Sequence, residues 1–147
     1  MRVDGPRITV LAGGTGAARF LTGLVAYCAD ERPGAQITVI GNTADDLRLH
    51  GLHISPDLDT VMYTLGGGVH PTQGWGRADE TTTVQSELGA YGIDALWFTL
   101  GDRDLATHVL RTQMLAGYPL SQVTQALCRR WLADVAVPVR LVPMTDD

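Results

Sequence analysis

The segment ITVLAGGTG at residues 8–16 decides the fold of this chain. Its first half is apolar and β-branched and is bounded by glycine, which is typical of a buried strand in a parallel sheet. Apolar residues then recur at helical spacing from Ala17 to Cys28, so we expect a helix directly after the glycines. A strand, a tight glycine turn and a helix in immediate succession predict the first unit of an α/β fold.

The rest of the chain repeats this alternation of short apolar runs and amphipathic stretches. Ser55 is expected as the N-cap of one helix and Pro56 as its first residue, because both types are favoured there. Strands joined by such helices form right-handed βαβ units, so we predict an α/β fold with a Rossmann-like, doubly wound, mostly parallel sheet. The expected strands are residues 8–11, 37–40, 95–98 and 137–142, and the expected helices are 17–28, 56–65, 80–91, 104–116 and 120–132.

The composition of the 147 residues excludes several classes of protein. A hydrophobic fraction of 45% and a charged fraction of 18% rule out a disordered chain and a coiled coil. The net charge of −5 argues against a nucleic-acid partner, which usually needs a basic patch. No apolar run approaches the roughly 20 residues of a membrane-spanning helix, and no basic-then-apolar leader is present. Cys28 and Cys128 lie in apolar helical patterns, so we expect buried thiols in a cytoplasmic protein without a membrane partner.

The glycine turn predicts an anion site. Free N–H groups and the helix dipole at such a junction favour a phosphate, although a tight turn alone would also account for the glycines. The dinucleotide-binding fingerprint G-x-G-x-x-G is incomplete, because Arg19 stands at the position of the third glycine. The second strand is followed by Asn42, and no acidic residue stands there to bind a ribose. A Lys-Ser or Lys-Thr pair after the glycines is also lacking, which argues against a Walker loop.

Carboxylates gather at the predicted ligand edge of the sheet. Asp45 and Asp46 follow the second strand, and Asp57 and Asp59 open the next helix. Mg²⁺ is typically held by one or two carboxylates together with substrate phosphates. Solvated loop acids explain the same pattern, and Asp57 would stabilise a helix N-terminus in any case. The residues alone therefore indicate a parallel α/β domain for a phosphorylated ligand, with Mg²⁺ as the expected cofactor.

A third group of acids follows the strand expected at 95–98. Asp102 and Asp104 come after Gly101 and precede a helix, so either one is also a candidate helix cap. The four histidines form no Ser-His-Asp or Cys-His arrangement by spacing, and the two cysteines make no zinc signature.

Several motifs, taken in order, resemble one known family. These are LAGGTG at 11–16, NTADD at 42–46, HGLHISPDLDT at 50–60, GWG at 74–76, LGDRDLATH at 100–108 and PMTDD at 143–147. Together they resemble the 2-phospho-L-lactate transferase family of coenzyme F-420 biosynthesis. YTLGGGV at 63–69 and RTQM at 111–114 are similar to its actinobacterial branch, the phosphoenolpyruvate transferases.

The resemblance implies a reaction. This family moves a phosphoenolpyruvyl or 2-phospholactyl group from a guanosine-diphospho donor to the deazaflavin FO, releases GMP and requires Mg²⁺. By motif matching, Asp59 and Thr99 fall on FO-binding positions, and Asp45 and Asp59 are the candidates for catalysis and for metal binding. The full set of expected substrate-binding residues is Gly13, Gly14, Thr15, Gly16, Asn42, Asp46, His53, Ser55, Asp57, Asp59, Thr99, Gly101 and Asp102.

The resemblance also sets limits and a rival. Ala17 and Ala44 replace glycines that are common in the family. Family members are about twice as long, near the size of a large single domain. Residues 1–147 are therefore expected to be the N-terminal part of one Rossmann-like domain without its C-terminal half, inactive alone and part of a homodimer. The rival is the related gluconeogenesis-factor family of UDP-sugar-binding regulators, which shares the Gly-Gly-Thr-Gly loop.

One expectation concerns the orientation of Asp59. The apolar face of its helix is expected to consist of Leu58, Val61, Met62 and Leu65, so the Asp59 side chain should point away from that face. On this basis Asp59→Asn should melt almost normally while losing transfer activity.

Overall fold

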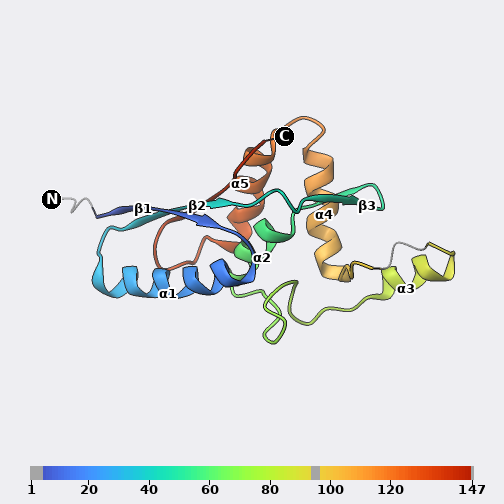
Figure 1. The fold of residues 1–147 in the computed structure, drawn as a ribbon, viewed down its shortest axis with the longest axis horizontal. Coiled ribbons are helices and arrows are strands. Elements are labelled where there is room, and N and C mark those ends of the chain that lie inside the picture. The colour runs from blue at the N-terminus through green and yellow to red at the C-terminus, as the bar shows by residue number, and fades with distance from the viewer. Residues whose placement is uncertain (1–4, 94–96, 147) are drawn as a thin grey trace.

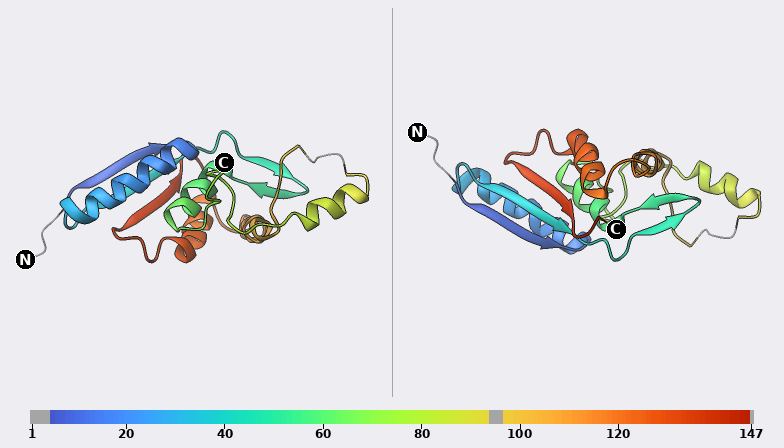
Figure 2. Two further views of the ribbon diagram at one scale, coloured as in Figure 1. Left: turned by 90° about the horizontal axis from the view of Figure 1, so that it is seen from below. Right: turned by 90° about the horizontal axis from the view of Figure 1, so that it is seen from above.

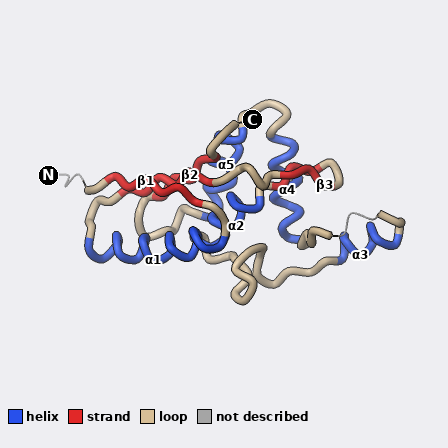
Figure 3. Tube along the Cα trace, in the orientation of Figure 1, coloured by secondary structure: helices blue, strands red, loops and turns tan. Residues whose placement is uncertain are grey.

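The computed structural model describes residues 5–93 and 97–146 as an α/β chain (Figure 1). Figure 3 marks its strands in red and its helices in blue along the trace. The elements are β1 (Arg7–Ala12), α1 (Thr15–Glu31), β2 (Gln36–Gly41), β3 (Leu47–Leu49), β4 (Leu52–Ile54), α2 (Pro56–Leu65), α3 (Thr83–Ala90), α4 (Asp102–Met114), α5 (Leu120–Trp131) and β5 (Val139–Pro143).

The main sheet is parallel, with the strand order β1–β2–β5. Val10 pairs with Val39, which pairs with Leu141, and this face of the sheet packs into the main core with residues of α1, α2 and α5. Side chains alternate between the two faces of a strand, and on the other face Leu11 is 80% exposed. The predicted Rossmann-like α/β fold with a parallel sheet is confirmed.

The helix limits lie within three residues of the predicted ones, and the strands differ from the prediction in two places. The last strand begins at Val139, after Pro138, because proline has no N–H to donate to a sheet. Of the strand predicted at 95–98, the first two residues lie outside the described part of the chain. Trp97 and Phe98 form a bend, so the strand prediction is wrong for these two residues. Trp97 is 74% exposed and cannot belong to a strand buried on both faces.

A two-stranded hairpin, β3–β4, was not predicted. Its strands have three residues each and are antiparallel. The turn residues His50 and Gly51 both have positive φ, 52° and 77°, as a two-residue hairpin turn of the primed type requires. Leu49 and Ile54 form a second small core with Leu100. The hairpin packs against α4, and it lies with α3 at the end of the molecule far from the N-terminus (Figure 2).

The glycines at 66–68 serve packing. A Cβ on Gly68 would collide with the Trp131 ring, and a Cβ on Gly66 would lie 2.7 Å from the Trp131 carbonyl oxygen. The Trp131 ring in turn lies edge to face with Tyr63, with ring centroids 4.9 Å apart. The absence of side chains at these glycines therefore lets the end of α5 pack closely on α2. Among the described helices, none is long and apolar enough to cross a membrane.

Candidate functional site

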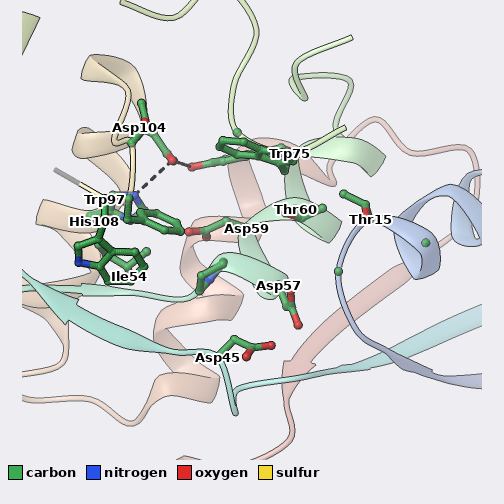
Figure 4. Close-up of a pocket in the computed structure, with 17 residues that line it drawn as sticks. Thr15, Asp45, Ile54, Asp57, Asp59, Thr60, Trp75, Trp97, Asp104 and His108 are labelled. Carbon is green, nitrogen blue, oxygen red and sulfur yellow. Dashed lines mark hydrogen bonds and ion pairs between the residues drawn. The ribbon is translucent and has the colours of Figure 1, made fainter. Parts of the chain in front are cut away.

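A cavity of about 750 Å³ lies at the carboxyl ends of β1 and β2 and reaches the first turns of α2 and α4 (Figure 4). This edge of a parallel sheet is where α/β folds bind ligands. In Figure 4, Thr15 lies toward one end of the cavity and Asp104 and His108 toward the other. The described lining residues are Gly14, Thr15, Gly16, Asp45, Ile54, Pro56, Asp57, Asp59, Thr60, Tyr63, Trp75, Gly76, Trp97, Phe98, Thr99, Asp104 and His108.

The predicted site residues divide into two groups. Those that line the cavity are Gly14, Thr15, Gly16, Asp45, Asp57, Asp59 and Thr99. Those that lie outside its lining are Gly13, Asn42, Asp46, His53, Ser55, Gly101 and Asp102. Of the second group, Asn42 bonds to two lining carboxylates, Asp46, His53 and Ser55 bond to one another, and Asp102 caps α3.

The glycine turn brings α1 against the Asp57 carboxylate. Gly14 is the N-cap residue of α1, and no side chain caps this end of the helix. A Cβ on Gly14 would lie 2.8 Å from Asp57 Oδ1, so a side chain here would displace the carboxylate. The backbone at the start of α1 therefore opens into the cavity beside a negative charge, an arrangement suited to a phosphate held together with a cation.

Asn42 joins two carboxylates at this end of the cavity. Its amide nitrogen donates to Asp45 Oδ2 at 2.9 Å and to Asp57 Oδ2 at 2.8 Å. The amide oxygen accepts from the Ala44 N–H at 3.1 Å, which fixes the orientation of the amide. Each carboxylate keeps a second oxygen outside this bridge. Asp45 is exposed and Asp57 is half-buried, so both are open to an ion or a ligand in the cavity.

Asp46, His53 and Ser55 form a polar cluster beside the cavity. Ser55 occupies the N-cap position of α2, as predicted, but its hydroxyl donates to Asp46 Oδ2 at 2.7 Å instead of capping the helix. His53 Nε2 lies 3.0 Å from the same oxygen. This cluster ties the β2–β3 connection to the start of α2, and its contacts account for all three residues as supports of the site.

Asp59 faces Arg111 of α4 and the cavity, not the apolar residues of its own helix, and it is buried there. Arg111 Nη1 donates to Asp59 Oδ2 at 3.2 Å, and Arg111 Nη2 donates to Oδ1. Asp59 is 5% exposed and Arg111 1% exposed. Burial raises the pKa of Asp59, while the Arg111 charge opposes this rise. Burial lowers the pKa of Arg111, but the charge and hydrogen bonding of Asp59, with smaller contributions from the charges of Tyr63 and Asp46, together outweigh it, so the pKa is raised.

Arg111 was missed in the sequence because its partner is 52 residues away. A weak signal exists, since His108 and Arg111 are three residues apart and so share one face of α4. Arg111 Nη1 also lies 3.3 Å from His108 Nδ1 and donates to the His53 carbonyl oxygen at 3.4 Å. A single buried guanidinium therefore connects α2, α4 and β4 beneath the cavity.

Asp104 and His108 form the far end of the cavity, with Tyr63 and Thr107 behind them. The Tyr63 hydroxyl donates to Asp104 Oδ1 and lies 2.8 Å from the Thr107 hydroxyl. His108 Nε2 lies 3.3 Å from Asp104 Oδ2. Burial raises the pKa of Asp104, but the hydrogen bonds of His108 and Tyr63 and the charges of His108 and Arg111 together lower it more, so it falls below its ordinary value. Burial raises the pKa of Tyr63, which keeps its hydroxyl protonated as a donor.

Asp59, Asp104 and His108 bring ligating atoms within 4.8 Å of one another. A metal at this cluster would nevertheless face the Arg111 cation, whose nitrogen is 3.3 Å from His108 Nδ1. The buried guanidinium repels a second cation at this cluster. The cluster suits hydrogen bonding, and Asp45 and Asp57 are better placed for a cation.

Asp102, at the start of α4, caps α3, and Glu80, which precedes α3, caps α4. The Asp102 carboxylate accepts from the Thr83 and Val84 amides in the first turn of α3, at 2.9 and 3.0 Å. The Glu80 carboxylate accepts from the Arg103 and Asp104 amides in the first turn of α4, at 2.7 and 2.9 Å. A Cβ on Gly101 would collide with the Glu80 carboxylate. Gly101 and Asp102 are thus explained by capping.

Asp102→Ala should loosen the first turn of α3. Hydrogen bonds, first from Thr81, lower the pKa of Asp102 to about 2. A carboxylate with a lowered pKa stabilises the fold above its ordinary value of 3.8, and the effect is lost as the pH falls through about 2. We expect faster amide exchange at Thr83 and Val84 in the variant, measured by NMR at neutral pH. Glu87→Gln in the same helix is the control, and an unchanged exchange rate would contradict the capping role.

Comparison with known proteins places the chain among the transferases of one family. The family model described as "2-phospho-L-lactate transferase CofD" matches residues 8–147. A phosphoenolpyruvate transferase of Streptomyces avermitilis is 64% identical over 142 residues, which cover 96% of this chain and 42% of the relative. Proteins of the same name from Thermobifida fusca and Mycobacterium tuberculosis are 62% and 53% identical, each over 96% of this chain and 44% of the relative.

The chain thus spans less than half the length of the curated relatives it matches. The match extends over nearly the whole of this chain and includes the glycine turn, the carboxylates of α2 and the first turn of α4. On this evidence the chain belongs to the 2-phospho-L-lactate transferase family.

Proposed function

We propose that the full-length protein transfers a phosphoenolpyruvyl group from a guanosine-diphospho donor to the deazaflavin FO, with release of GMP, in coenzyme F-420 biosynthesis. The observation that best supports this is a single cavity with two different ends. The glycine turn, Asp45 and Asp57 lie at one end, and Trp97 and the Asp104–His108 pair lie at the other. The names of the relatives favour the phosphoenolpyruvyl donor over the 2-phospholactyl donor.

The donor end suits a diphosphate. Backbone N–H groups at the start of α1 bind phosphate oxygens, and the helix dipole favours their negative charge. The terminal ribityl hydroxyl of FO then attacks the phosphorus that bears the three-carbon acid. A new oxygen–phosphorus bond forms, the bond from that phosphorus to the bridging oxygen breaks, GMP leaves with the electron pair, and the hydroxyl proton passes to water. Such transfers depend on positioning and charge neutralisation, which is consistent with the lack of a nucleophilic triad among the described residues.

Mg²⁺ fits the carboxylates at the donor end. Asp45 and Asp57 are held side by side by the Asn42 amide, and Mg²⁺ is usually bound by one or two carboxylates plus substrate phosphates. When bound there, the ion would neutralise diphosphate charge. Asp59, the other expected ligand, already accepts from Arg111 through both oxygens. We therefore propose Asp45 and Asp57 for the ion, and keep Asp59 as a residue that lies next to bound FO.

The aromatic wall suits the planar ring of FO. Trp75, Trp97 and Phe98 line the cavity together with Thr99. Trp97 and Phe98 lie edge to face, with ring centroids 5.7 Å apart, and Trp75 is 43% exposed. Aromatic side chains bind flat heterocycles by stacking and edge contacts. Thr99, the residue matched to an FO-binding position, thus lies on the wall where the ring would bind.

The test is a transfer assay on the full-length protein. FO is mixed with the phosphoenolpyruvyl and phospholactyl guanosine donors in separate reactions, with and without Mg²⁺, and the product is weighed by mass spectrometry. We expect FO to gain the phosphoenolpyruvyl group, GMP to be released and EDTA to stop the reaction. UDP-sugar binding without FO binding would instead support the regulatory family that shares the glycine loop.

A further inference from the structure

Between α2 and α3 the chain forms a narrow loop, residues 69–77, whose two sides pair at its base. Val69 and Arg77 form an isolated antiparallel bridge. Next to this bridge, the His70 N–H donates to the Gly76 carbonyl oxygen at 3.0 Å. The 69–77 loop therefore has a closed base with the conformation of a small hairpin.

The base of the 69–77 loop is fixed to the body of the molecule by Arg77. Its guanidinium lies 5.0 Å from the ring centroid of Trp131 and 5.9 Å from that of Tyr63, distances at which a cation is attracted to an aromatic face. Arg77 Nη1 also donates to the Arg103 carbonyl oxygen at 3.4 Å. A single side chain thus joins the loop to α5, α2 and α4.

His70 organises the tip of the same loop. Its Nδ1 atom accepts from the backbone N–H of Thr72 at 3.3 Å and from that of Gln73 at 3.2 Å. Its carbonyl oxygen accepts from the Gly74 N–H at 3.1 Å. Hydrogen bonds from a side chain to nearby backbone groups define the shape of a turn. Without the imidazole, the Thr72 and Gln73 N–H groups would lose this acceptor and the tip would lose its shape.

The tip carries Trp75 into the wall of the cavity. Gly74 and Gly76, on either side of it, have φ values of 74° and 66°, which glycine adopts without strain. A Cβ on Gly74 would lie 3.7 Å from Thr15 Cγ2, so the tip lies against the start of α1. Trp75 lines the cavity and, in Figure 4, lies between Thr15 at one end and Asp104 at the other. The indole is thus held over the middle of the cavity.

The middle of the cavity is where the donor phosphorus and the FO hydroxyl would meet, and water competes there with FO. If water attacks, its oxygen bonds to the phosphorus, the bond to the bridging oxygen breaks, GMP leaves with the electron pair and a proton passes to solvent. The products are then phosphoenolpyruvate and GMP. Covering a reaction site excludes water and prevents such hydrolysis. Trp75 is 43% exposed, so more than half of its surface is turned away from solvent.

We propose that His70 is a positioning residue, which holds Trp75 over the middle of the cavity so that FO and not water receives the transferred group. The imidazole acts through the shape of the 69–77 loop and not by contact with a substrate. This inference rests on the proposed function, because it requires the donor diphosphate to bind at the glycine turn.

The experiment measures two products of the full-length protein with the phosphoenolpyruvyl guanosine donor, FO and Mg²⁺. Phosphoenolpyruvate reports hydrolysis, and phosphoenolpyruvyl-FO reports transfer. In His70→Leu, which has no acceptor for the two N–H groups, we expect the ratio of hydrolysis to transfer to rise about 10-fold, since two hydrogen bonds are lost. His70→Asn places an amide oxygen where the histidine has Nδ1 and should keep the wild-type ratio. Glu87→Gln, exposed on α3, is the control.

The outcomes separate this inference from the proposed function. If the wild-type protein transfers nothing to FO, the proposed function fails and the inference fails with it. If the wild type transfers but His70→Leu has the same product ratio, or His70→Asn is as hydrolytic as His70→Leu, only the inference is overturned.

A second variant covers the case in which His70→Leu does not fold. Trp75→Leu removes the covering ring itself and should raise the ratio of hydrolysis to transfer by at least as much. An unchanged ratio in Trp75→Leu would overturn the inference. Where both variants fold, the double variant should match Trp75→Leu alone, because His70 acts through Trp75 and the two effects are not additive.

Discussion

Arg111→Met should destabilise the full-length protein by about 3–5 kcal/mol, because it leaves the Asp59 carboxylate buried without its partner. Both groups are almost fully inaccessible to water, and both carboxylate oxygens accept from the same guanidinium. Methionine fills a similar volume but supplies no charge and no donor. The loss is measured as the free energy of unfolding in urea.

A matched double variant tests the cause. Arg111→Met combined with Asp59→Leu removes both charges together, and replacing a buried ion pair by apolar residues is often neutral or stabilising. We therefore expect the double variant to recover most of the stability lost by Arg111→Met. If the double variant is less stable than the single one, the ion pair is not the source of the loss.

The stability of the single variant Arg111→Met should depend on pH in a defined direction. Burial already raises the pKa of Asp59, and Arg111 opposes that rise, so losing Arg111 raises it further. A carboxyl with a raised pKa in the folded state binds more protons when folded, and stability then falls as the pH rises. The destabilisation should be smaller near pH 4 than near pH 8. For this reason we now expect Asp59→Asn to impair both stability and transfer.

Asp57→Asn should lower the transfer rate by roughly 10²–10³-fold while leaving the melting temperature nearly unchanged. Asp57 is half-buried, and its Oδ2 accepts from Asn42, a bond that an asparagine oxygen can replace. What the variant loses is a negative charge beside the start of α1, next to the expected diphosphate and Mg²⁺.

The measurement is the transfer rate of the full-length variant over a range of Mg²⁺ concentrations. We expect the concentration for half-maximal rate to rise in Asp57→Asn and in Asp45→Asn. Glu87→Gln is the charge-matched control and should retain the wild-type curve. A full rate with an unchanged Mg²⁺ dependence would show that Asp57 only stabilises the N-terminus of α2.

The sheet was predictable because each strand is a local apolar run. The predicted strands at residues 8–11 and 37–40 cover most of β1 and β2. The hairpin β3–β4 was not predicted because strands of three residues are too short to show the two-residue alternation of apolar and polar side chains. The sequence does contain a signal, since His50 and Gly51 separate two alternating triplets and glycine favours the positive φ of such a turn.

The site residues that lie in loops and at element ends were predictable from the sequence, and the contacts buried beneath the cavity were not. Asp45 and Asp57 follow from their places at strand and helix ends, which local patterns reveal. The pairing of Asp59 with Arg111 joins α2 to α4 across 52 residues, and no local pattern contains that information. The capping role of Asp102 was anticipated in kind, but the helix that it caps is α3 and not its own α4.

The reciprocal caps between α3 and α4 have a consequence for how this part of the molecule opens. The residue that completes the first turn of α4, Glu80, precedes α3, and the residue that completes the first turn of α3, Asp102, begins α4. Unwinding either helix start releases the carboxylate that stabilises the other, so the two ends gain or lose their order together as one cooperative unit. Phe98 and Thr99 lie between the two caps and line the cavity. The order of this wall therefore depends on the two carboxylates together.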